Sequence, residues 1–175
     1  MNYWHDIEPG TADEMNVIIE IPKGSKNKYE IDKKTGLIAL DRAMHSAQDY
    51  PFDYGFVPRT LWGDGDALDV VILSTYPLAP GILVKARPVA FMNMNDSGED
   101  DEKIIAVPIN DLRWKDVKDL HDVNKHTIKE IQHFFETYKS IINKEVKIGA
   151  IEGAGKAKEA FAKSLLIYKE KFPAK

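Results

Sequence analysis

Asp64-Gly65-Asp66-Ala67-Leu68-Asp69-Val70-Val71-Ile72-Leu73 is an acidic turn that leads directly into an apolar, β-branched segment. The apolar segment predicts a buried strand, and the glycine and aspartates before it predict a tight turn. We name residues 64–69 the first acidic loop. A second acidic loop, residues 96–103, also lies beside a strand-like segment. Because carboxylates this close together resist ionising at the same time, each loop predicts either a solvated turn or a site for divalent cations.

The presence of two such loops, each beside a predicted strand, favours a metal site. Carboxylate oxygens suit Mg²⁺, Mn²⁺ or Ca²⁺ and suit Zn²⁺ poorly. The calcium-binding EF-hand is excluded, because a loop that starts at Asp64 has Leu68 and Asp69 where the motif needs an oxygen ligand and a glycine. Asp64-Gly65-Asp66 also resembles the Asp-x-Asp of phosphotransferases that form an aspartyl-phosphate. That alternative stays open, although those enzymes place the apolar strand before the pair.

On both sides of this segment, short β-prone runs alternate with Pro and Gly through the first two-thirds of the chain. The predicted strands cover residues 15–21, 28–32, 37–41, 69–75, 82–93 and 104–108. The last third predicts one helix capped by Asn124, with apolar positions as far as Ile142, and a second over residues 156–172, ended by Pro173. This order predicts an α+β domain in which short antiparallel strands form a small, partly closed barrel.

The composition is that of an ordinary globular protein. The chain has 175 residues, of which 43% are apolar and 30% charged, and we predict one domain over residues 1–175. It has no cysteine, which excludes disulfides and thiolate-bound metals. A net charge of −4 without a basic run argues against a nucleic-acid partner. Because no signal peptide and no membrane-spanning run is recognisable, we expect a cytoplasmic protein with no membrane partner.

Two further patterns carry no site. Residues 149–156 are glycine-rich but lack the spacing of a P-loop, so we predict a loop that leads into the last helix. The five histidines lack His-Glu-x-x-His spacing, and we assign them no ligand role. An OB-like barrel can also bind oligonucleotides, a non-enzymatic hypothesis that would need a basic, aromatic-lined strand face.

Cations and phenols accompany the acidic loops. Lys28, Arg42, Lys103 and Lys139 lie close to predicted strand or helix ends, and the aromatic segment 50–58 holds two tyrosines. Each of these residues alone is typical of a solvated surface or a core position. Together with the carboxylates they match a metal-chelated phosphate site, in which metals bridge phosphoryl oxygens while Lys, Arg and Tyr hold the oxygens that remain.

Several motifs also follow one another in a fixed order along nearly the whole chain. They are Ile19-Glu20-Ile21-Pro22, Lys28-Tyr29-Glu30, Asp41-Arg42, Tyr50-Pro-x-x-Tyr54-Gly55, the two acidic loops and His133-Phe-Phe-Glu-Thr-Tyr138-Lys139. In these motifs and in its length the chain resembles the compact prokaryotic members of the soluble family I inorganic pyrophosphatases. The resemblance implies a five-stranded OB-like barrel with flanking C-terminal helices and hydrolysis of Mg-pyrophosphate to two phosphates. It also implies several Mg²⁺ ions per site, with Mn²⁺ or Zn²⁺ as substitutes, and a homohexamer.

The resemblance further implies roles for individual residues. The implied metal ligands are Asp64, Asp69, Asp96, Asp101, Glu20 and Glu30. The implied substrate-binding residues are Lys28, Arg42, Tyr54, Lys103, Tyr138 and Lys139, of which Tyr54 also lies near the nucleophile. Asp66 lies between two ligands and is not itself committed to an ion, so we expect it to be the general base for the attacking water. Two departures are Ala67, where the family commonly has Pro, and residues 140–147, where we assign no catalytic lysine.

Overall fold

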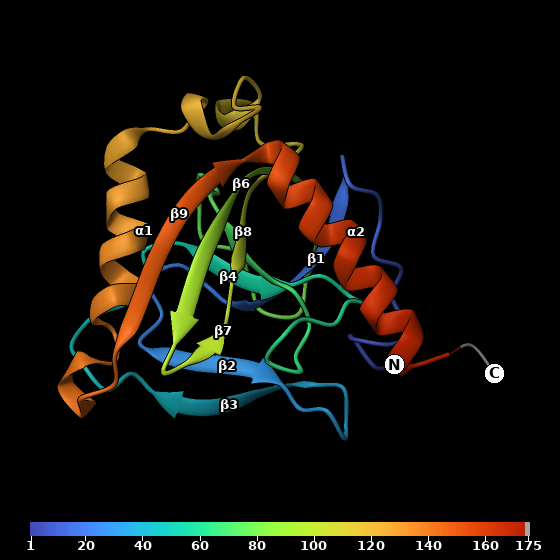
Figure 1. Cartoon of the computed structure of the whole chain (residues 1–175), viewed down its shortest axis with the longest axis horizontal. Helices are drawn as coiled ribbons and strands as arrows, with labels where there is room; N and C mark the ends of the chain where they lie inside the picture. Colours follow the sequence, from blue (N-terminus) through green and yellow to red (C-terminus); the bar gives the residue numbers. More distant parts are fainter. Residues whose placement is uncertain (174–175) are drawn as a thin grey trace.

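The computed structural model describes residues 1–173, in which most strands precede the two α-helices (Figure 1). The strands are β1 (Met15–Ile21), β2 (Asn27–Ile31), β3 (Ile38–Ala43), β4 (Asp53–Phe56), β5 (Asp69–Ile72), β6 (Leu83–Asp96), β7 (Glu99–Asp100), β8 (Lys103–Pro108) and β9 (Val146–Gly153). The helices are α1 (Lys125–Thr137) and α2 (Ala154–Lys171), with 3-10 turns η1 (Leu112–Trp114), η2 (Leu120–Asp122) and η3 (Ser140–Ile142). The predicted α+β class is confirmed.

Five strands close into a ring. β1 pairs with β4, β4 with β5, β5 with β8, β8 with β6, and β6 returns to β1. This ring confirms the five-stranded, OB-like arrangement. β7 and β9 add to β6, while β2 and β3 form a separate hairpin. Figure 1 shows this hairpin below the ring and the two helices on either side of β6.

One pairing in the ring departs from the antiparallel arrangement that we expected. β5 and β8 are parallel, with Asp69 opposite Lys103 and Ile72 opposite Ala106. The reason is the long strand β6, which lies between β5 and β8 in the sequence. It returns the chain to the other end of the ring and is antiparallel to both β1 and β8. Because β5 and β8 each begin at an acidic loop, their parallel pairing brings the two loops to the same edge of the ring.

The structure contains three strands that we did not predict, namely β4, the two-residue β7 and β9. β4 lies inside the aromatic segment 50–58, and β9 covers residues for which we predicted a loop, so that prediction is wrong. β9 forms because Val146, Ile148 and Ile151 pair with β6 and pack on the core. These contacts outweigh the low strand propensity of the two glycines in β9, of which Gly149 lies inside the strand and Gly153 at its end.

The helices differ from the prediction at their ends. α1 ends at Thr137, and Ile142 lies in η3 instead of on the helix. Asn143 ends η3 in the left-handed conformation, with a φ of 56°. α2 begins slightly earlier than predicted, at Ala154, and ends before Pro173. Within residues 1–173, neither helix combines the length and the apolar character needed to cross a bilayer.

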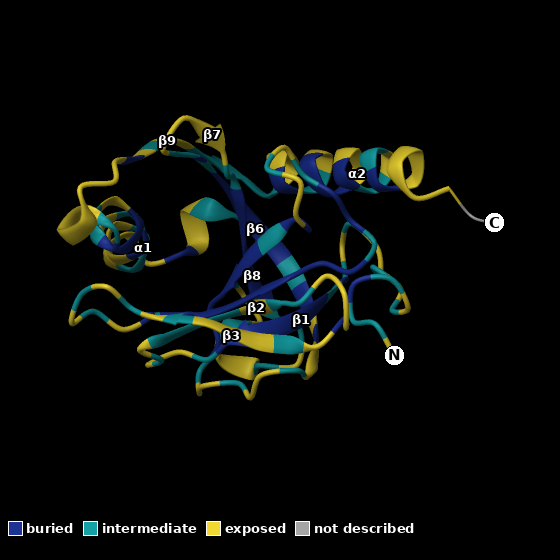
Figure 2. Ribbon diagram, turned by 90° about the horizontal axis from the view of Figure 1, so that it is seen from below, coloured by how far each residue is buried: buried dark blue, intermediate teal, exposed yellow. Residues whose placement is uncertain are grey.

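The core fills the ring and continues under the helices, where the strands in Figure 2 are dark blue. α1 packs two phenylalanines against the aromatic segment, and the rings of Phe52 and Phe135 stack with their centroids 5.4 Å apart. Burial of each such ring contributes about 1.5–3 kcal/mol. β1 and β4 approach each other so closely that a Cβ on Gly55 would lie 2.0 Å from the carbonyl oxygen of Ile18. This close packing fixes the backbone beside Tyr54, a residue that lines a cavity at the surface of the ring.

Candidate active site

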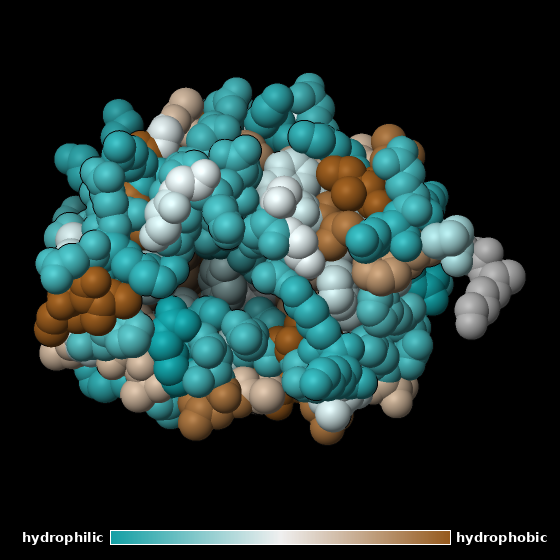
Figure 3. All heavy atoms as spheres, turned by 60° about the horizontal axis from the view of Figure 1, so that its bottom comes forward, coloured by the Kyte–Doolittle hydropathy of each residue, from teal (hydrophilic) through white to brown (hydrophobic). Residues whose placement is uncertain are grey.

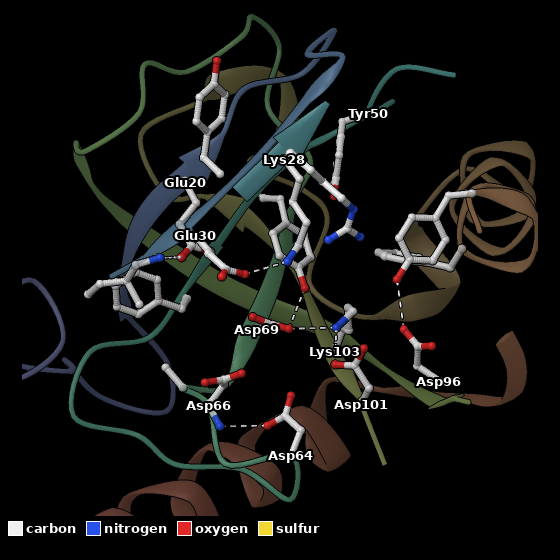
Figure 4. A pocket seen from close by; sticks show the side chains of 18 of the residues that line it. Glu20, Lys28, Glu30, Tyr50, Asp64, Asp66, Asp69, Asp96, Asp101 and Lys103 are labelled. Atoms are coloured by element: carbon white, nitrogen blue, oxygen red, sulfur yellow. Dashed lines mark hydrogen bonds and ion pairs between the residues drawn. The ribbon is translucent and has the colours of Figure 1, made fainter. Parts of the chain in front are cut away.

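A cavity of about 280 Å³ lies where the acidic loops, the β2–β3 hairpin and the end of α1 meet (Figure 4). Every site residue predicted from the sequence lines it, namely Glu20, Lys28, Glu30, Arg42, Tyr54, Asp64, Asp66, Asp69, Asp96, Asp101, Lys103, Tyr138 and Lys139. In Figure 3 the face toward the viewer is hollowed near its centre, and the side chains around the hollow are mostly hydrophilic. The fold thus gathers carboxylates, cations and phenols from segments far apart in the sequence.

Three carboxylates converge in this cavity. Asp64 lies in the first acidic loop, Asp69 begins β5, and Asp101 lies in the second acidic loop; one carboxylate oxygen from each lies within 4.8 Å of the other two. We call these three residues the carboxylate group. Each offers a carboxylate oxygen, the donor type that Mg²⁺ prefers, and the three oxygens lie close enough together for one cation to be held among them. The group therefore fits a hard cation in both donor type and spacing.

Lys103 contacts two members of the carboxylate group. Its Nζ lies 2.8 Å from Asp69 Oδ2 and 2.6 Å from Asp101 Oδ1, and its side chain is only 2% exposed. Burial alone would lower the pKa of Lys103, but the two aspartates outweigh it and raise that pKa above its usual range. Tyr54 donates a further hydrogen bond of 2.5 Å to Asp69 Oδ2. Lys103 therefore remains charged and orients two of the three carboxylates.

Negative charge is nevertheless in excess around the carboxylate group. Burial raises the pKa of Asp64 to about 6. Burial also raises the pKa of Asp101, although Lys103 opposes it. The pKa of Glu20 lies well above its usual value, because the side chain is buried and Asp69 is close. Raised pKa values on three neighbouring acids mean that their charged forms are destabilised, and a bound divalent cation would relieve this.

Asp96 has the reverse environment in the same cavity. It ends β6, while Tyr138 and Lys139 directly follow α1. The Lys139 ammonium group pairs with Asp96 Oδ2, and the Tyr138 hydroxyl donates to the same oxygen at 3.1 Å. Burial would raise the pKa of Asp96, but the hydrogen bonds from Lys139, Ser97 and Tyr138 and the charge of Lys139 together outweigh it and lower that pKa. Asp96 lies outside the carboxylate group, and its charge is balanced by Lys139.

The β2–β3 hairpin supplies two more cations. Lys28 and Arg42 lie opposite each other in the strand register, and both pair with Asp41, Lys28 at 3.1 Å. Lys28 Nζ also lies 2.7 Å from Glu30 Oε2. Although burial opposes the change, Glu30 and Asp41 raise the pKa of Lys28. The side chains of Lys28 and Arg42 are 26% and 28% exposed, so an anion in the cavity can still reach both cations.

Sequence reasoning assigned no role to several residues that line this cavity, among them Lys33 and Tyr50. Lys33, from the turn between β2 and β3, forms an ion pair with Asp66 and lies 6.0 Å from the centre of the Trp4 ring. Its sequence context is that of an ordinary exposed turn, so no signal distinguishes it from Lys34. Tyr50 also lines the cavity, and burial raises its pKa to about 12. Its signal was present, because it begins one of the ordered motifs, but we assigned it no role.

A cavity of this kind defines a class of proteins that bind an anion complexed with divalent metal, because carboxylates fit the metal while Lys, Arg and Tyr fit anionic oxygens. The family model described as inorganic pyrophosphatase matches residues 17–169. The chain is 43% identical over 172 residues to the inorganic pyrophosphatase of Picrophilus torridus, covering 97% of each chain. It is 47% identical over 169 residues to soluble inorganic pyrophosphatase 5 of Arabidopsis thaliana, covering 95% of this chain and 78% of that one.

Solved structures agree with these sequence matches. The structure of inorganic pyrophosphatase from Thermus thermophilus superimposes with a TM-score of 0.92 at 41% identity, covering 97% of this chain and 99% of that one. That of the Helicobacter pylori inorganic pyrophosphatase gives a TM-score of 0.88 at 43% identity, covering 94% and 99%. The chain belongs to the inorganic pyrophosphatase family, as the ordered motifs predicted.

Proposed function

We propose that the protein hydrolyses inorganic pyrophosphate to two phosphate ions and that it does so with bound Mg²⁺. The observation that carries the proposal is one cavity in which the carboxylate group lies near Lys28, Arg42 and Lys139. Relatives that match over nearly their full length are named inorganic pyrophosphatases, which supports this substrate over other phosphoanhydrides. The excess of negative charge around the carboxylate group supports the need for added cations.

The metal ions belong, in this proposal, to the acidic residues of the cavity. We assign a first ion to Asp64, Asp69 and Asp101, with Asp69 shared by a second ion. Asp96, Glu20 and Glu30 serve further ions or their waters. Bound Mg²⁺ would neutralise phosphoryl oxygens and lower the pKa of a coordinated water far below that of bulk water. The all-oxygen donor set supports Mg²⁺ as the main cofactor and Mn²⁺ as a substitute, while Zn²⁺ as a substitute rests on the family resemblance alone.

The reaction joins the oxygen of a water to one phosphorus and breaks the bond from that phosphorus to the bridging oxygen. We assign Asp66 as the base that takes the proton of the attacking water. Its support is its place on the cavity wall outside the carboxylate group. The residues that we assign to the phosphate oxygens are Lys28, Arg42, Lys103, Tyr138 and Lys139, with Tyr54 beside the attacking water. Positioning and electrostatic stabilisation supply most of the rate in such a reaction.

Phosphate release from pyrophosphate, measured with and without Mg²⁺, tests this proposal. We expect release that depends on Mg²⁺ and stops with excess chelator. Trapping of a phosphorylated Asp64 in reactions quenched during turnover would favour an aspartyl-phosphate intermediate, because direct attack of water on phosphorus forms no phosphorylated Asp64. A chain that binds Mg²⁺ but leaves pyrophosphate intact would refute the assigned substrate.

We also propose that residues 1–175 form one domain that assembles as a cytoplasmic homohexamer without a nucleic-acid or membrane partner. The support is the family resemblance together with the net charge of −4. Light scattering during size-exclusion chromatography tests the assembly and should give six times the mass of the chain. A monomer at micromolar concentration would contradict the hexamer and leave the proposed chemistry untouched.

A further inference from the structure

A side-chain hydrogen bond joins the second acidic loop to the residue that lies two positions before the first acidic loop. The Trp62 indole Nε1–H donates to Glu102 Oε2 at 2.7 Å. Trp62 lies shortly before Asp64 in the chain, and Glu102 lies between Asp101 and Lys103. The bond therefore connects the residue next to Asp101 with a residue two positions before Asp64.

The backbone of Trp62 also determines the shape of the first acidic loop. Its N–H donates to the Asp66 carbonyl at 2.8 Å, and its carbonyl accepts from the Gly65 N–H at 3.1 Å. The Asp66 N–H in turn donates to Asp64 Oδ1 at 3.0 Å. These three bonds make residues 62–66 a compact turn, which links the position of Trp62 to that of Asp64.

The Trp62 ring is itself held by the rest of the fold. It packs edge-on against Phe91 of β6, with the ring centroids 6.2 Å apart, and the Lys163 ammonium group of α2 lies 5.0 Å from its centre. The loops also touch at a second point, since a Cβ on Gly63 would lie 3.7 Å from Asp100 Cβ. Trp62 is thus a fixed donor, and Glu102 is the partner that brings the second acidic loop to it.

We propose that the Trp62–Glu102 hydrogen bond sets the spacing between Asp64 and Asp101, which makes Trp62 and Glu102 positioning residues for the metal ion. The pairing of β5 with β8 starts at Asp69 and Lys103, and Asp64 and Asp101 precede these two residues in the sequence. The pairing of β5 with β8 therefore does not hold Asp64 and Asp101 together. Like charges on these two aspartates drive the loops apart when no cation is bound. The hydrogen bond opposes that movement and preorganises the carboxylate group, much as outer contacts orient metal ligands elsewhere.

This inference rests on the proposed metal site, so its test begins with Mg²⁺ binding to the wild-type protein by calorimetry. The variants are Glu102→Ala, Glu102→Gln, Trp62→Phe and the double variant Trp62→Phe/Glu102→Ala. Loss of the bond should raise the Kd for Mg²⁺ roughly tenfold in Glu102→Ala and in Trp62→Phe. Glu102→Gln loses the same charge but keeps an acceptor, so its Kd should stay near that of the wild type. The double variant should bind Mg²⁺ no more weakly than the weaker single variant, because both changes remove the same bond.

Trp114→Phe is the matched control. Among the described residues the Trp114 indole N–H is buried without a hydrogen-bond partner, so its removal breaks no bond and should leave the Kd unchanged. Unchanged binding in Glu102→Ala would overturn the inference, and so would equal weakening in Glu102→Gln, which would show an effect of charge alone. A wild-type protein that fails to bind Mg²⁺ would instead refute the proposed metal site.

Discussion

The carboxylate group and the Asp96–Lys139 pair line the same cavity but have opposite electrostatic balances. Asp64 and Asp96 are both partly buried, yet the pKa of Asp64 is raised to about 6 and the pKa of Asp96 is lowered. Burial disfavours the charged form of both, so the difference comes from their partners: Asp96 has the ammonium group of Lys139, while Asp64 has other carboxylates. An added cation would therefore stabilise the carboxylate group. The Asp96–Lys139 pair already contains a cation, the Lys139 ammonium group, which can also contact a phosphate oxygen.

Asp66 is the residue that departs from this division, because it lies in the first acidic loop yet is paired with a cation, Lys33. We expect Asp66→Asn to lower kcat by about 10²–10⁴ at neutral pH, the range for loss of a general base, while Mg²⁺ binding stays near normal. Steady-state kinetics at saturating Mg²⁺, together with calorimetry, measures both quantities. Full activity in this variant would remove Asp66 from its proposed role.

Asp69→Asn should break the carboxylate group itself. Asp69 contacts Lys103 and Tyr54 and is the proposed shared ligand, so we expect the Mg²⁺ concentration for half-maximal activity to rise by about two orders of magnitude. Titration of activity with Mg²⁺ measures the shift. The matched control is Asp116→Asn, which removes the same charge from an exposed position and should leave the titration unchanged. An unaltered curve for Asp69→Asn would contradict the shared-ligand assignment.

Lys139→Gln should affect the other region in a different way. It removes the cation that balances Asp96 and that we assign to a phosphate oxygen, so the KM for pyrophosphate should rise by roughly tenfold or more. The Kd for Mg²⁺ in the absence of substrate should change little. Kinetics at saturating Mg²⁺ tests this, with the exposed Lys129→Gln as the charge-matched control. A large loss of Mg²⁺ affinity with unchanged KM would mean that the two regions are not separable.

The stability of the metal-free protein should show the smallest effect. The raised pKa values of Asp64, Asp101 and Glu20 mean that the folded state binds protons more tightly than the unfolded state. Stability in chelator should therefore increase as the pH falls from about 7.5 to about 5, where Asp64 passes its pKa of about 6. With saturating Mg²⁺ the trend should reverse, since protons then displace metal. Thermal unfolding at both pH values measures this, and a rise in stability toward alkaline pH in chelator would contradict it.

Local chemistry along the chain was sufficient to predict much of this site. Aspartates beside a β-branched run identified Asp64 and Asp69, and the ordered motifs identified residues as distant as Lys28 and Lys139, all of which line one cavity. Lys33 was missed because its contact with Asp66 depends on how a hairpin lies over the ring, which no local pattern encodes. Pairing between strands that are distant in the sequence is likewise not encoded in any local pattern.

The parallel pairing of β5 with β8 and the strand β9 show this limit in the fold. Both depend on β6, whose length and path decide which strands lie beside it. Glycine in residues 149–153 favours a loop by propensity alone, and only the contact with β6 reverses that preference. The bond between Trp62 and Glu102 is likewise invisible in the sequence, because a tryptophan near a turn is more often a core residue.

The parallel pairing of β5 with β8 affects how easily these two strands separate in the folded protein. Asp69 and Asp101 belong to segments that precede and follow β6, so a cation held between them cross-links two parts of the chain that meet only when the ring is closed. A ligand that binds only the folded state stabilises it by about 2.7 kcal/mol at a free concentration one hundred times its Kd. Loading with metal should therefore suppress the local opening of β5 from β8 and slow cleavage of the acidic loops by a protease. The ion that we propose for catalysis would therefore also stabilise the closed ring of strands, and a chelator would remove that stabilisation.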